Sequence, residues 1–214
     1  MVAKILHKTS PPLPFSLSKL QMAASKKYDI TDTLAHAQKL YESGYVTYPR
    51  TGCEYIPEGH FAEASKIIDA IRSSYPALSD MLGGVDLSRK NAAWDDKKIT
   101  EHHAIIPTLK IPREGTLSPA EQKIYEMICA RYALQFLQDY EYEETTVEFL
   151  VCGETFRSMG RTVSCPVKGC KGMAVRLVSK KDNRLFWKCA KCGNFFDDAD
   201  GKPEIREKKT NREG

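Results

Sequence analysis

Residues 165–192 read CPVKGCKGMAVRLVSKKDNRLFWKCAKC and hold the most specific local pattern of the chain. The pattern consists of two short-spaced cysteine pairs, CxxxxC and CxxC, with eighteen residues between them. Zinc prefers four thiolates in a tetrahedron, and short-spaced pairs on two tight turns supply that geometry. We therefore predict a closed, structural zinc ribbon over residues 164–200, and its expected ligands are Cys165, Cys170, Cys189 and Cys192.

The residues around these cysteines fit such a ribbon. Gly169, Gly172 and Gly193 lie beside the cysteines, where tight turns need a positive φ. Between the two pairs, residues 174–178 and 185–188 have the composition of strands and predict a β-hairpin. A module of this size has too small a core to fold unaided, so the metal is expected to supply much of its stability.

The ribbon is also the basic end of the chain. Residues 165–192 carry eight Lys or Arg and one Asp, whereas the whole chain has a net charge of only +4. Basic clusters of this kind most often bind phosphates, although a solvated basic surface is the simpler alternative. The candidate DNA contacts are Lys168, Lys171, Arg176, Lys180, Lys181, Arg184, Trp187 and Lys188.

Aromatic residues are interleaved with these basic residues. Phe186, Trp187, Phe195 and Phe196 have two possible roles. They either stack on unpaired bases or form the small core of the ribbon itself.

Composition places the chain among ordinary globular proteins. Its 214 residues are 42% hydrophobic and 28% charged. It has no stretch of eighteen apolar residues, which excludes a helical membrane span, and its first residues lack the apolar region of a signal peptide. We therefore expect a cytoplasmic protein, in which structural disulfides are rare. The three remaining cysteines are interpreted as structural or incidental; they are Cys53, Cys129 and Cys152.

Outside the ribbon, the sequence predicts an α+β protein with a mainly helical first part. Prolines 11, 12 and 14 favour an extended strap over residues 1–14. A helical region is expected over residues 15–140 and a pair of strands over residues 141–163. The tail, residues 201–214, is rich in Lys, Arg and Glu and is expected to be disordered.

The helical region begins with two short predicted helices. The first carries a capping box formed by Ser18 and Gln21, and the second runs from about Thr31 to Gly44. The β-branched and aromatic run over residues 45–48 follows and predicts a strand. Together these elements indicate a helix-turn-helix unit with a wing-like strand.

Two further helices complete the helical region. Residues 60–74 place isoleucines at helical spacing. Ser118, Pro119 and Glu121 combine a capping box with proline at the first helical position, which predicts a helix from there to about Gln138.

The segment Tyr48-Pro49-Arg50-Thr51 carries the other candidate chemistry. A tyrosine at the end of a strand usually belongs to the core, and the guanidinium of Arg50 is suited to bind an oxyanion. The pair His102-His103 either supplies further donors or is a structural, hydrogen-bonded feature. These residues alone do not predict an enzyme.

Three sequence blocks, in this order, resemble the type IA DNA topoisomerases, with details similar to the topoisomerase III branch. The blocks are PPLPFSLSKLQ at residues 11–21, GYVTYPRT at 44–51 and HHAIIPT at 102–108. The resemblance covers about residues 10–163. The ribbon is similar to the carboxy-terminal ribbons of bacterial members of this family.

The resemblance implies a fold and a reaction. The fold would be a mainly helical winged-helix (CAP-like) domain that carries the tyrosine, part of a β arch, and the four-cysteine ribbon. Tyr48 would attack a phosphodiester of single-stranded DNA and stay joined to the 5′-phosphate, while another strand passes through the break. Arg50 and His102 would bind the scissile phosphate. The implied cofactors are structural Zn²⁺ and Mg²⁺, and the implied location is the nucleoid in the cytoplasm.

Two departures from the family pattern limit this expectation. The family usually has an acidic residue directly after Arg-Thr or Arg-Ser, and here that residue is Gly52. The glutamate and Asp-x-Asp acids that hold magnesium in the family's Toprim domain have no match in the first 47 residues. We therefore expect a carboxy-terminal portion that is inactive alone, with single-stranded DNA and a chain that supplies the Toprim domain as its partners.

Three origins and two functions fit such a portion. A truncated gene product, one part of a split enzyme and an engineered piece all fit. The alternative function is a catalytically inactive remnant that binds single strands, or a zinc-ribbon adaptor that contacts another protein. Retention of Tyr48, Arg50 and His102 favours the enzyme, whereas Gly52 and the unmatched metal ligands favour the remnant.

Overall fold

The computed structural model divides the chain into two compact units, which are described separately. One unit is Ser10–Gln138, and the other combines Met1–Thr9 with Asp139–Gly214. The structure describes residues 2–74, 82–113, 115–167, 169–179, 181–199 and 202–204. In this described part, no helix is long and apolar enough to cross a membrane.

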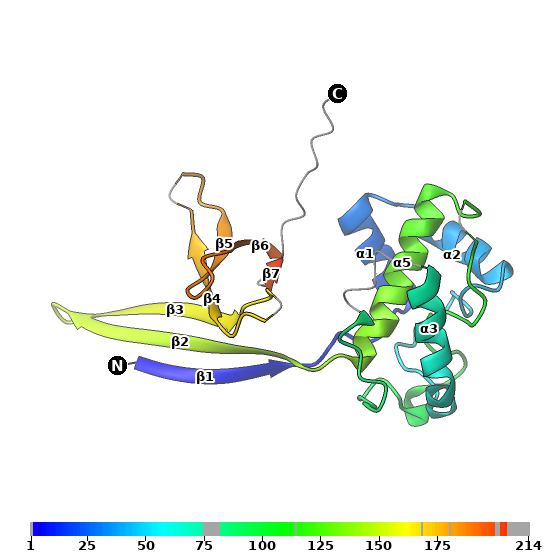
Figure 1. Cartoon of the computed structure of the whole chain (residues 1–214), viewed down its shortest axis with the longest axis horizontal. Helices are drawn as coiled ribbons and strands as arrows, with labels where there is room; N and C mark the ends of the chain where they lie inside the picture. The colour runs from blue at the N-terminus through cyan, green and yellow to red at the C-terminus, as the bar shows by residue number, and fades with distance from the viewer. Residues whose placement is uncertain are drawn as a thin grey trace. The chain divides into compact units, whose positions relative to one another are not determined.

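The unit Ser10–Gln138 is built mainly from helices (Figure 1). Its α-helices are α1 (Leu17–Tyr28), α2 (Thr33–Glu42), α3 (Ala64–Ser74) and α5 (Pro119–Ala133). Short 3₁₀ helices cover Glu58–Glu63, Asp96–Lys98 and Leu134–Phe136. Buried side chains from all four of these α-helices and from the loops form one core, whose largest members include Ile68, Ile71, Tyr125, Tyr132 and Phe136.

Helix α5 begins as the sequence predicts. The Ser118 hydroxyl accepts a hydrogen bond from the Glu121 amide at 3.3 Å, and the Glu121 carboxylate accepts one from the Ser118 amide at 2.9 Å. Pro119 is the first helical residue. The helix ends at Ala133 rather than near Gln138, and the chain continues as the 3₁₀ helix Leu134–Phe136. In this turn, buried Gln135 donates through its side chain to the carbonyls of Pro12 and Arg131.

The predicted start of α1 is wrong. The helix begins one residue earlier than the proposed cap, and Ser16 occupies the N-cap position without a side-chain capping bond. Its hydroxyl instead donates to Glu54 at 3.2 Å, a residue far away in sequence. A long-range contact has therefore replaced the local capping box predicted from Ser18 and Gln21.

The wing-like strand predicted over residues 45–48 is not formed. In this segment only Val46 makes a β-bridge, with Pro107. The predicted helix over 60–74 is also divided, since Glu58–Glu63 is a 3₁₀ helix and α3 starts at Ala64. The two helices of the predicted helix-turn-helix unit are present as α1 and α2, and residues 29–32 join them.

The second unit is a seven-stranded antiparallel sheet whose strands pair in chain order (Figure 1). Its long strands are β1 (Val2–Thr9), β2 (Tyr140–Val151) and β3 (Glu154–Ser164). The shorter strands are β4 (Met173–Val178), β5 (Leu185–Cys189), β6 (Phe195–Ala199) and β7 (Lys202–Glu204). The predicted hairpins over 141–163 and within the ribbon are both present.

Both ends of this sheet correct the sequence predictions. Residues 2–9 are not a free strap: they pair with β2 from Val2 opposite Val147 to Thr9 opposite Tyr140. Ion pairs from Lys4 and Lys8 to glutamates of β2 support this pairing. The tail is not wholly disordered, because β7 pairs with β6. The rest of the predicted tail, residues 205–214, lies outside the described residues.

The ribbon and the long hairpin share one core, although we predicted separate segments for them. Val163 of β3 lies opposite Ala174 of β4, so the sheet continues from one into the other. Val163 and Ala174 are buried with Trp187 and Phe196, and Tyr140 and Tyr142 of β2 pack against this cluster. The ribbon therefore obtains apolar partners that its own sequence does not supply.

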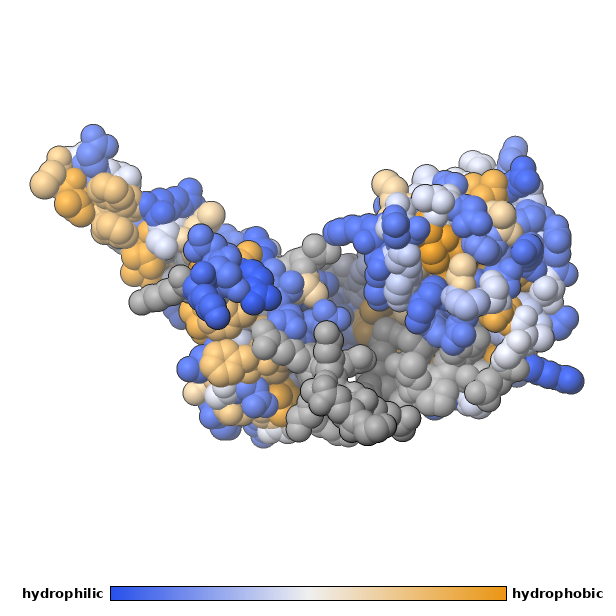
Figure 2. All heavy atoms as spheres, turned by 90° about the horizontal axis from the view of Figure 1, so that it is seen from above, coloured by the Kyte–Doolittle hydropathy of each residue, from blue (hydrophilic) through white to orange (hydrophobic). Residues whose placement is uncertain are grey.

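The far end of the β2–β3 hairpin exposes apolar side chains (Figure 2). Phe149 and Phe156 lie opposite each other with stacked rings, 5.7 Å between centroids, and each is about half exposed. Leu150 and Val151 next to the turn are also exposed. This end of the sheet lacks an apolar cover within the part of the chain that the structure describes.

Removal of the α5 cap should destabilise the helical unit. We expect Ser118→Ala to lower the free energy of unfolding by about 1 kcal/mol, because the Glu121 amide loses its partner at the helix start. Urea denaturation followed by circular dichroism measures this change. Ser118→Thr is the matched control and should retain most of the stability; an equal loss in both variants would contradict the capping role.

Candidate active site and metal centre

The tyrosine segment is held against residues 102–108 by hydrogen bonds. The Thr47 amide donates to the Ile106 carbonyl at 3.0 Å. The Thr47 hydroxyl donates to the Ala104 carbonyl and accepts from the Ile106 amide, each at 3.0 Å. Thr108 donates through its amide to the Tyr45 carbonyl. The Thr47 side chain thus replaces part of the backbone hydrogen-bond ladder that a regular strand would provide.

Tyr48 lies half-buried between two other rings. Its ring centroid is 4.5 Å from that of His102 and 5.4 Å from that of Tyr41, which meets it edge-on. His102 is itself exposed. The structure therefore brings together two of the three predicted catalytic residues, with the imidazole beside the phenol ring.

Thr51 fixes the segment on the other side of the tyrosine. Its buried hydroxyl donates to the His102 carbonyl at 3.1 Å and accepts from the Cys53 amide at 3.0 Å. Its carbonyl accepts from the Leu17 amide at the start of α1. Thr51 thus couples the backbone of Tyr48 and Arg50 to that of His102, a role that the sequence prediction missed.

Arg50 is exposed at the edge of a surface pocket of about 260 Å³. In the described part of the chain, its guanidinium makes no ion pair. An unpaired guanidinium presents its donors to an oxyanion. The pocket is lined by Arg50, Thr51, Gly52, Cys53, Lys98, Thr100, Glu101 and His102.

The two adjacent histidines have different environments. His103 is half-buried, and its Nδ1 lies 2.8 Å from the Ala104 carbonyl, so this nitrogen carries the proton that it donates. Burial lowers the pKa of His103, and the nearby His60 lowers it further. His103 is thus a structural histidine, and only His102 lines the pocket.

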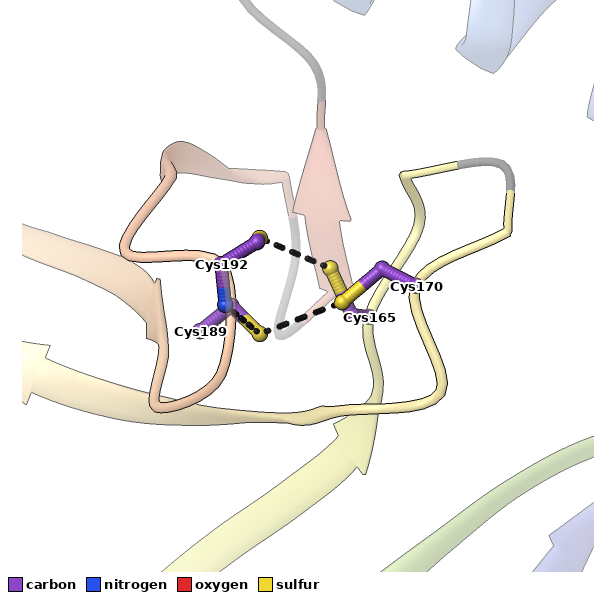
Figure 3. A group of neighbouring side chains, drawn as sticks. All are labelled: Cys165, Cys170, Cys189 and Cys192. Atoms are coloured by element: carbon purple, nitrogen blue, oxygen red, sulfur yellow. Dashed lines mark hydrogen bonds between the residues drawn. The ribbon is translucent and has the colours of Figure 1, made fainter.

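The four ribbon cysteines form one cluster (Figure 3). The Cys165 and Cys192 sulfurs are 3.7 Å apart, the Cys170 and Cys189 sulfurs are 3.8 Å apart, and all four lie within 4.8 Å of one another. A tetrahedron with Zn–S bonds of about 2.3 Å has sulfur–sulfur edges of about 3.8 Å. The arrangement therefore fits a zinc ion held by four thiolates, as predicted.

The turns around the cluster favour metal binding. The Cys189 sulfur accepts from the amides of Lys191 at 3.3 Å and Cys192 at 3.4 Å. The amide of Cys192 is the main reason that the pKa of Cys189 falls to about 6. A Cβ added at Gly172 would lie 2.8 Å from the Cys189 sulfur and 2.5 Å from the Lys191 Cβ. Only glycine fits at position 172.

Two of the predicted DNA contacts bind within the ribbon instead of extending freely from its surface. Trp187 is fully buried, and its indole nitrogen donates to Asp198 at 2.7 Å. Arg176 makes two hydrogen bonds to the same carboxylate, at 2.8 and 2.6 Å. Both side chains stabilise the ribbon: Trp187 fills its small core, and Arg176 pairs with the partly buried carboxylate of Asp198. The predicted contacts Lys168 and Lys180 lie outside the described residues.

Other predicted contacts remain on the surface of the ribbon. Lys171, Lys181, Arg184 and Lys188 are exposed, although Arg184 is paired with Asp182. The Lys188 ammonium lies 5.1 Å from the centroid of the exposed Phe195 ring. The ring centroids of Phe186 and Phe195 are 5.9 Å apart. Phe196, in contrast to Phe195, is buried. The four aromatic residues thus divide between the core and the surface.

The other three cysteines lie outside the metal cluster. Cys129 is fully buried on α5, and burial raises the pKa of its thiol. Cys53 is half-buried in the pocket, and Cys152 is exposed at the β2–β3 turn. Among the residues described, the ribbon cysteines are the only group of three or more His, Cys, Asp or Glu placed to share a metal.

Substitution of Gly172 should abolish zinc binding. In Gly172→Ala the new methyl group would occupy the space of the Cys189 sulfur and displace it from the tetrahedron. We expect loss of bound zinc, measured by metal analysis of the purified chain, and a lower melting temperature of the ribbon. Gly160→Ala on β3 is the matched control, since its added Cβ meets nothing within 4 Å. Full zinc occupancy in Gly172→Ala would contradict the assignment.

Residues 2–169 match the protein family described as DNA topoisomerase. DNA topoisomerase 3 of Pasteurella multocida is 39% identical over 180 residues, which cover 81% of this chain and 26% of that protein. DNA topoisomerase 3 of Haemophilus influenzae is 37% identical over 162 residues, which cover 74% of this chain and 25% of that protein. The chain thus spans about a quarter of the length of the curated relatives that it matches.

A solved structure has a similar fold. The full-length topoisomerase I from Thermotoga maritima superposes with a TM-score of 0.53 and 23% identity, covering 75% of this chain and 27% of that one. The likeness in fold agrees with the matches in sequence. On these grounds the chain belongs to the type IA DNA topoisomerase family, among relatives named DNA topoisomerase 3.

Proposed function

We propose that this chain contributes the nucleophile of a type IA topoisomerase, which cleaves and rejoins single-stranded DNA and thereby allows strand passage. The observation that carries the proposal is the placement of Tyr48 beside His102, next to a pocket with an unpaired Arg50 at its edge. This combination offers a nucleophile together with two groups that bind a phosphate. Family membership supports the same reading.

In the proposed reaction, the Tyr48 phenol oxygen attacks a backbone phosphorus. A bond forms between the tyrosine and the 5′-phosphate, and the bond to the 3′-oxygen of the upstream nucleotide breaks. The phenol proton leaves during attack, and a proton reaches the 3′-oxygen. Because the phosphotyrosine ester keeps the energy of the broken bond, the reverse step rejoins the strand without ATP.

Arg50 and His102 would stabilise the charge that develops on the phosphate. Fixed donors at the equatorial oxygens are the main protein contribution to phosphoryl transfer. The hydrogen bonds of Thr47 and Thr51 support this role, because they fix the backbone on both sides of Tyr48 against the segment that carries His102.

Magnesium would enter the reaction from elsewhere. The described residues near Tyr48 contain no cluster of acids that fits a magnesium site. A Toprim domain would supply the Mg²⁺ ligands, and no step is derived through the metal.

DNA binding would use both units. The exposed lysines 171, 181 and 188 and the ring of Phe195 form a surface suited to phosphates and unpaired bases. In the helical unit, α1 and α2 would act as a helix-turn-helix (CAP-like) element without a wing strand. Binding to DNA would place the protein on the nucleoid in the cytoplasm.

Gly52 favours a second candidate function. No side chain at this position can orient Arg50, so the chain would bind single strands without cutting them. A Cβ added at Gly52 meets nothing within 4 Å, so an acidic residue fits there sterically. The two functions therefore differ in cleavage but share DNA binding.

A covalent adduct distinguishes the two functions. We would incubate the chain with 3′-labelled single-stranded DNA and magnesium, together with a separately expressed Toprim domain from a relative. We expect label on the protein after denaturation, because the 5′-phosphotyrosine link retains the 3′-labelled fragment. Tyr48→Phe should lose the label, and Tyr41→Phe should keep it, since Tyr41 only contacts the ring.

Each outcome of the adduct experiment has a defined meaning. Label in Tyr48→Phe would overturn the assignment of the nucleophile. Absence of label in every variant, with DNA binding intact, would favour the non-cleaving remnant, and Gly52→Asp would then test whether an acid restores cleavage.

Phe195 should contribute to single-strand binding. We expect Phe195→Ala to weaken binding of oligothymidylate about tenfold, because stacking of one base on an aromatic ring contributes about 1–3 kcal/mol. Fluorescence anisotropy at fixed salt measures the change. Phe149→Ala, which removes an equally exposed ring from the β2–β3 hairpin, is the matched control. Equal losses in both variants would argue against a specific stacking site on the ribbon.

A further inference from the structure

The pocket at Arg50 extends beyond the three proposed catalytic residues. Its lining comes from two segments, residues 50–53 and residues 98–102. The Thr51 hydroxyl joins the two segments at His102, and the Cys53 sulfur lies 3.6 Å from the Lys98 carbonyl. The second segment therefore carries Lys98 and Thr100 to the same pocket as Arg50.

The charged groups of the pocket make it attractive to an anion. Arg50 and Lys98 are cationic, and Glu101 is the single acid in the lining. Gly52, where the family usually has an acid, adds no negative charge and leaves open space above its Cα. Each phosphodiester carries one negative charge, so Arg50 and Lys98 offer one cation for each of two neighbouring phosphates.

Lys98 is held at the pocket and is still accessible. Its ammonium lies 4.6 Å from the centroid of the Tyr55 ring and 3.6 Å from an oxygen of Asp95, and half of its side chain is exposed. The Tyr55 side chain, with a smaller effect from Asp95, raises the pKa of Lys98. The Lys98 ammonium, in contact with the Tyr55 ring and 3.6 Å from Asp95, retains N–H donors for a ligand.

We propose that this pocket is a second phosphate subsite, in which Lys98 and Thr100 bind the backbone phosphate next to the one that faces Tyr48. The inference rests on the proposed function, because it assumes that the scissile phosphate lies between Tyr48, Arg50 and His102. Two neighbouring phosphates bound by the two joined segments would fix the position of the DNA strand along its own direction. Lys98 thereby selects which phosphate meets the tyrosine, and it acts as a positioning residue.

The salt dependence of DNA binding tests the subsite in the whole chain. The logarithm of the affinity for oligothymidylate falls with the logarithm of the salt concentration, with a slope of about −0.7 for each phosphate contact. We expect Lys98→Gln to make this slope shallower by about 0.7. Lys97→Gln removes a neighbouring exposed lysine that does not line the pocket, and it should leave the slope unchanged. Lys98→Arg should retain the slope of the unmodified chain.

A thiol reagent provides an independent measurement. Cys53 lines the pocket, whereas Cys152 lies at the β2–β3 turn. We expect oligothymidylate to slow the alkylation of Cys53, measured by mass spectrometry of its peptide, and to leave that of Cys152 unchanged. In Lys98→Gln this protection should diminish.

The outcomes separate the subsite from the proposed reaction. An unchanged slope in Lys98→Gln, or equal changes in Lys97→Gln and Lys98→Gln, would overturn the subsite even where Tyr48 forms an adduct. A shallower slope specific to Lys98, combined with protection of Cys53, would support the subsite even where no adduct forms, and the failure would then belong to the cleavage step alone.

Discussion

The hydroxyl groups of Thr47 and Thr51 join two segments of the chain that contain no regular strand. Thr51 and His102 are 51 residues apart in sequence, and one hydrogen bond of 3.1 Å connects them. Thr47 adds a donor and an acceptor bond on the opposite side of Tyr48. Each bond is worth only about 1 kcal/mol, but their positions on both sides of the tyrosine determine which rings and charges face one another. The candidate site, the pocket and the placement of Lys98 all depend on this pairing.

The sequence predicted best those features that depend on neighbouring residues. The capping box of α5, the two β-hairpins and the four cysteines are local patterns, and the structure contains all of them. The predictions failed where distant residues compete with local ones. Glu54 takes the hydroxyl of Ser16 at the start of α1, and β2 binds the residues predicted as a strap. At the candidate site, Tyr48, Arg50 and His102 could be named from the family resemblance, but Thr51 and Lys98 could not, because only the fold brings them together.

The ribbon illustrates how a small metal module gains stability from its neighbours. Its own buried residues include Trp187 and Phe196, and the hairpin adds Val163 together with the rings of Tyr140 and Tyr142. This need for a core explains why Trp187 was unavailable as a DNA contact. The guanidinium of Arg176 is likewise engaged inside the ribbon, because it donates to the same Asp198 carboxylate as Trp187. Fewer basic side chains are therefore free to bind DNA than the composition indicates, and Lys171, Lys181 and Lys188 are the exposed lysines among the predicted contacts.

Strand β1 is the outer strand of the sheet, and it has a partner on one side only within the described residues. A row of backbone donors and acceptors on such an edge can pair with a strand of another molecule. The exposed apolar residues at the end of the β2–β3 hairpin lie in the same unit and would add contact area to such pairing. Lys4 and Lys8 bring charge to the edge, but both are already neutralised by glutamates. Concentrated solutions of the purified chain will therefore tend toward self-association through this unit, and dilute samples are the appropriate choice for quantitative binding work.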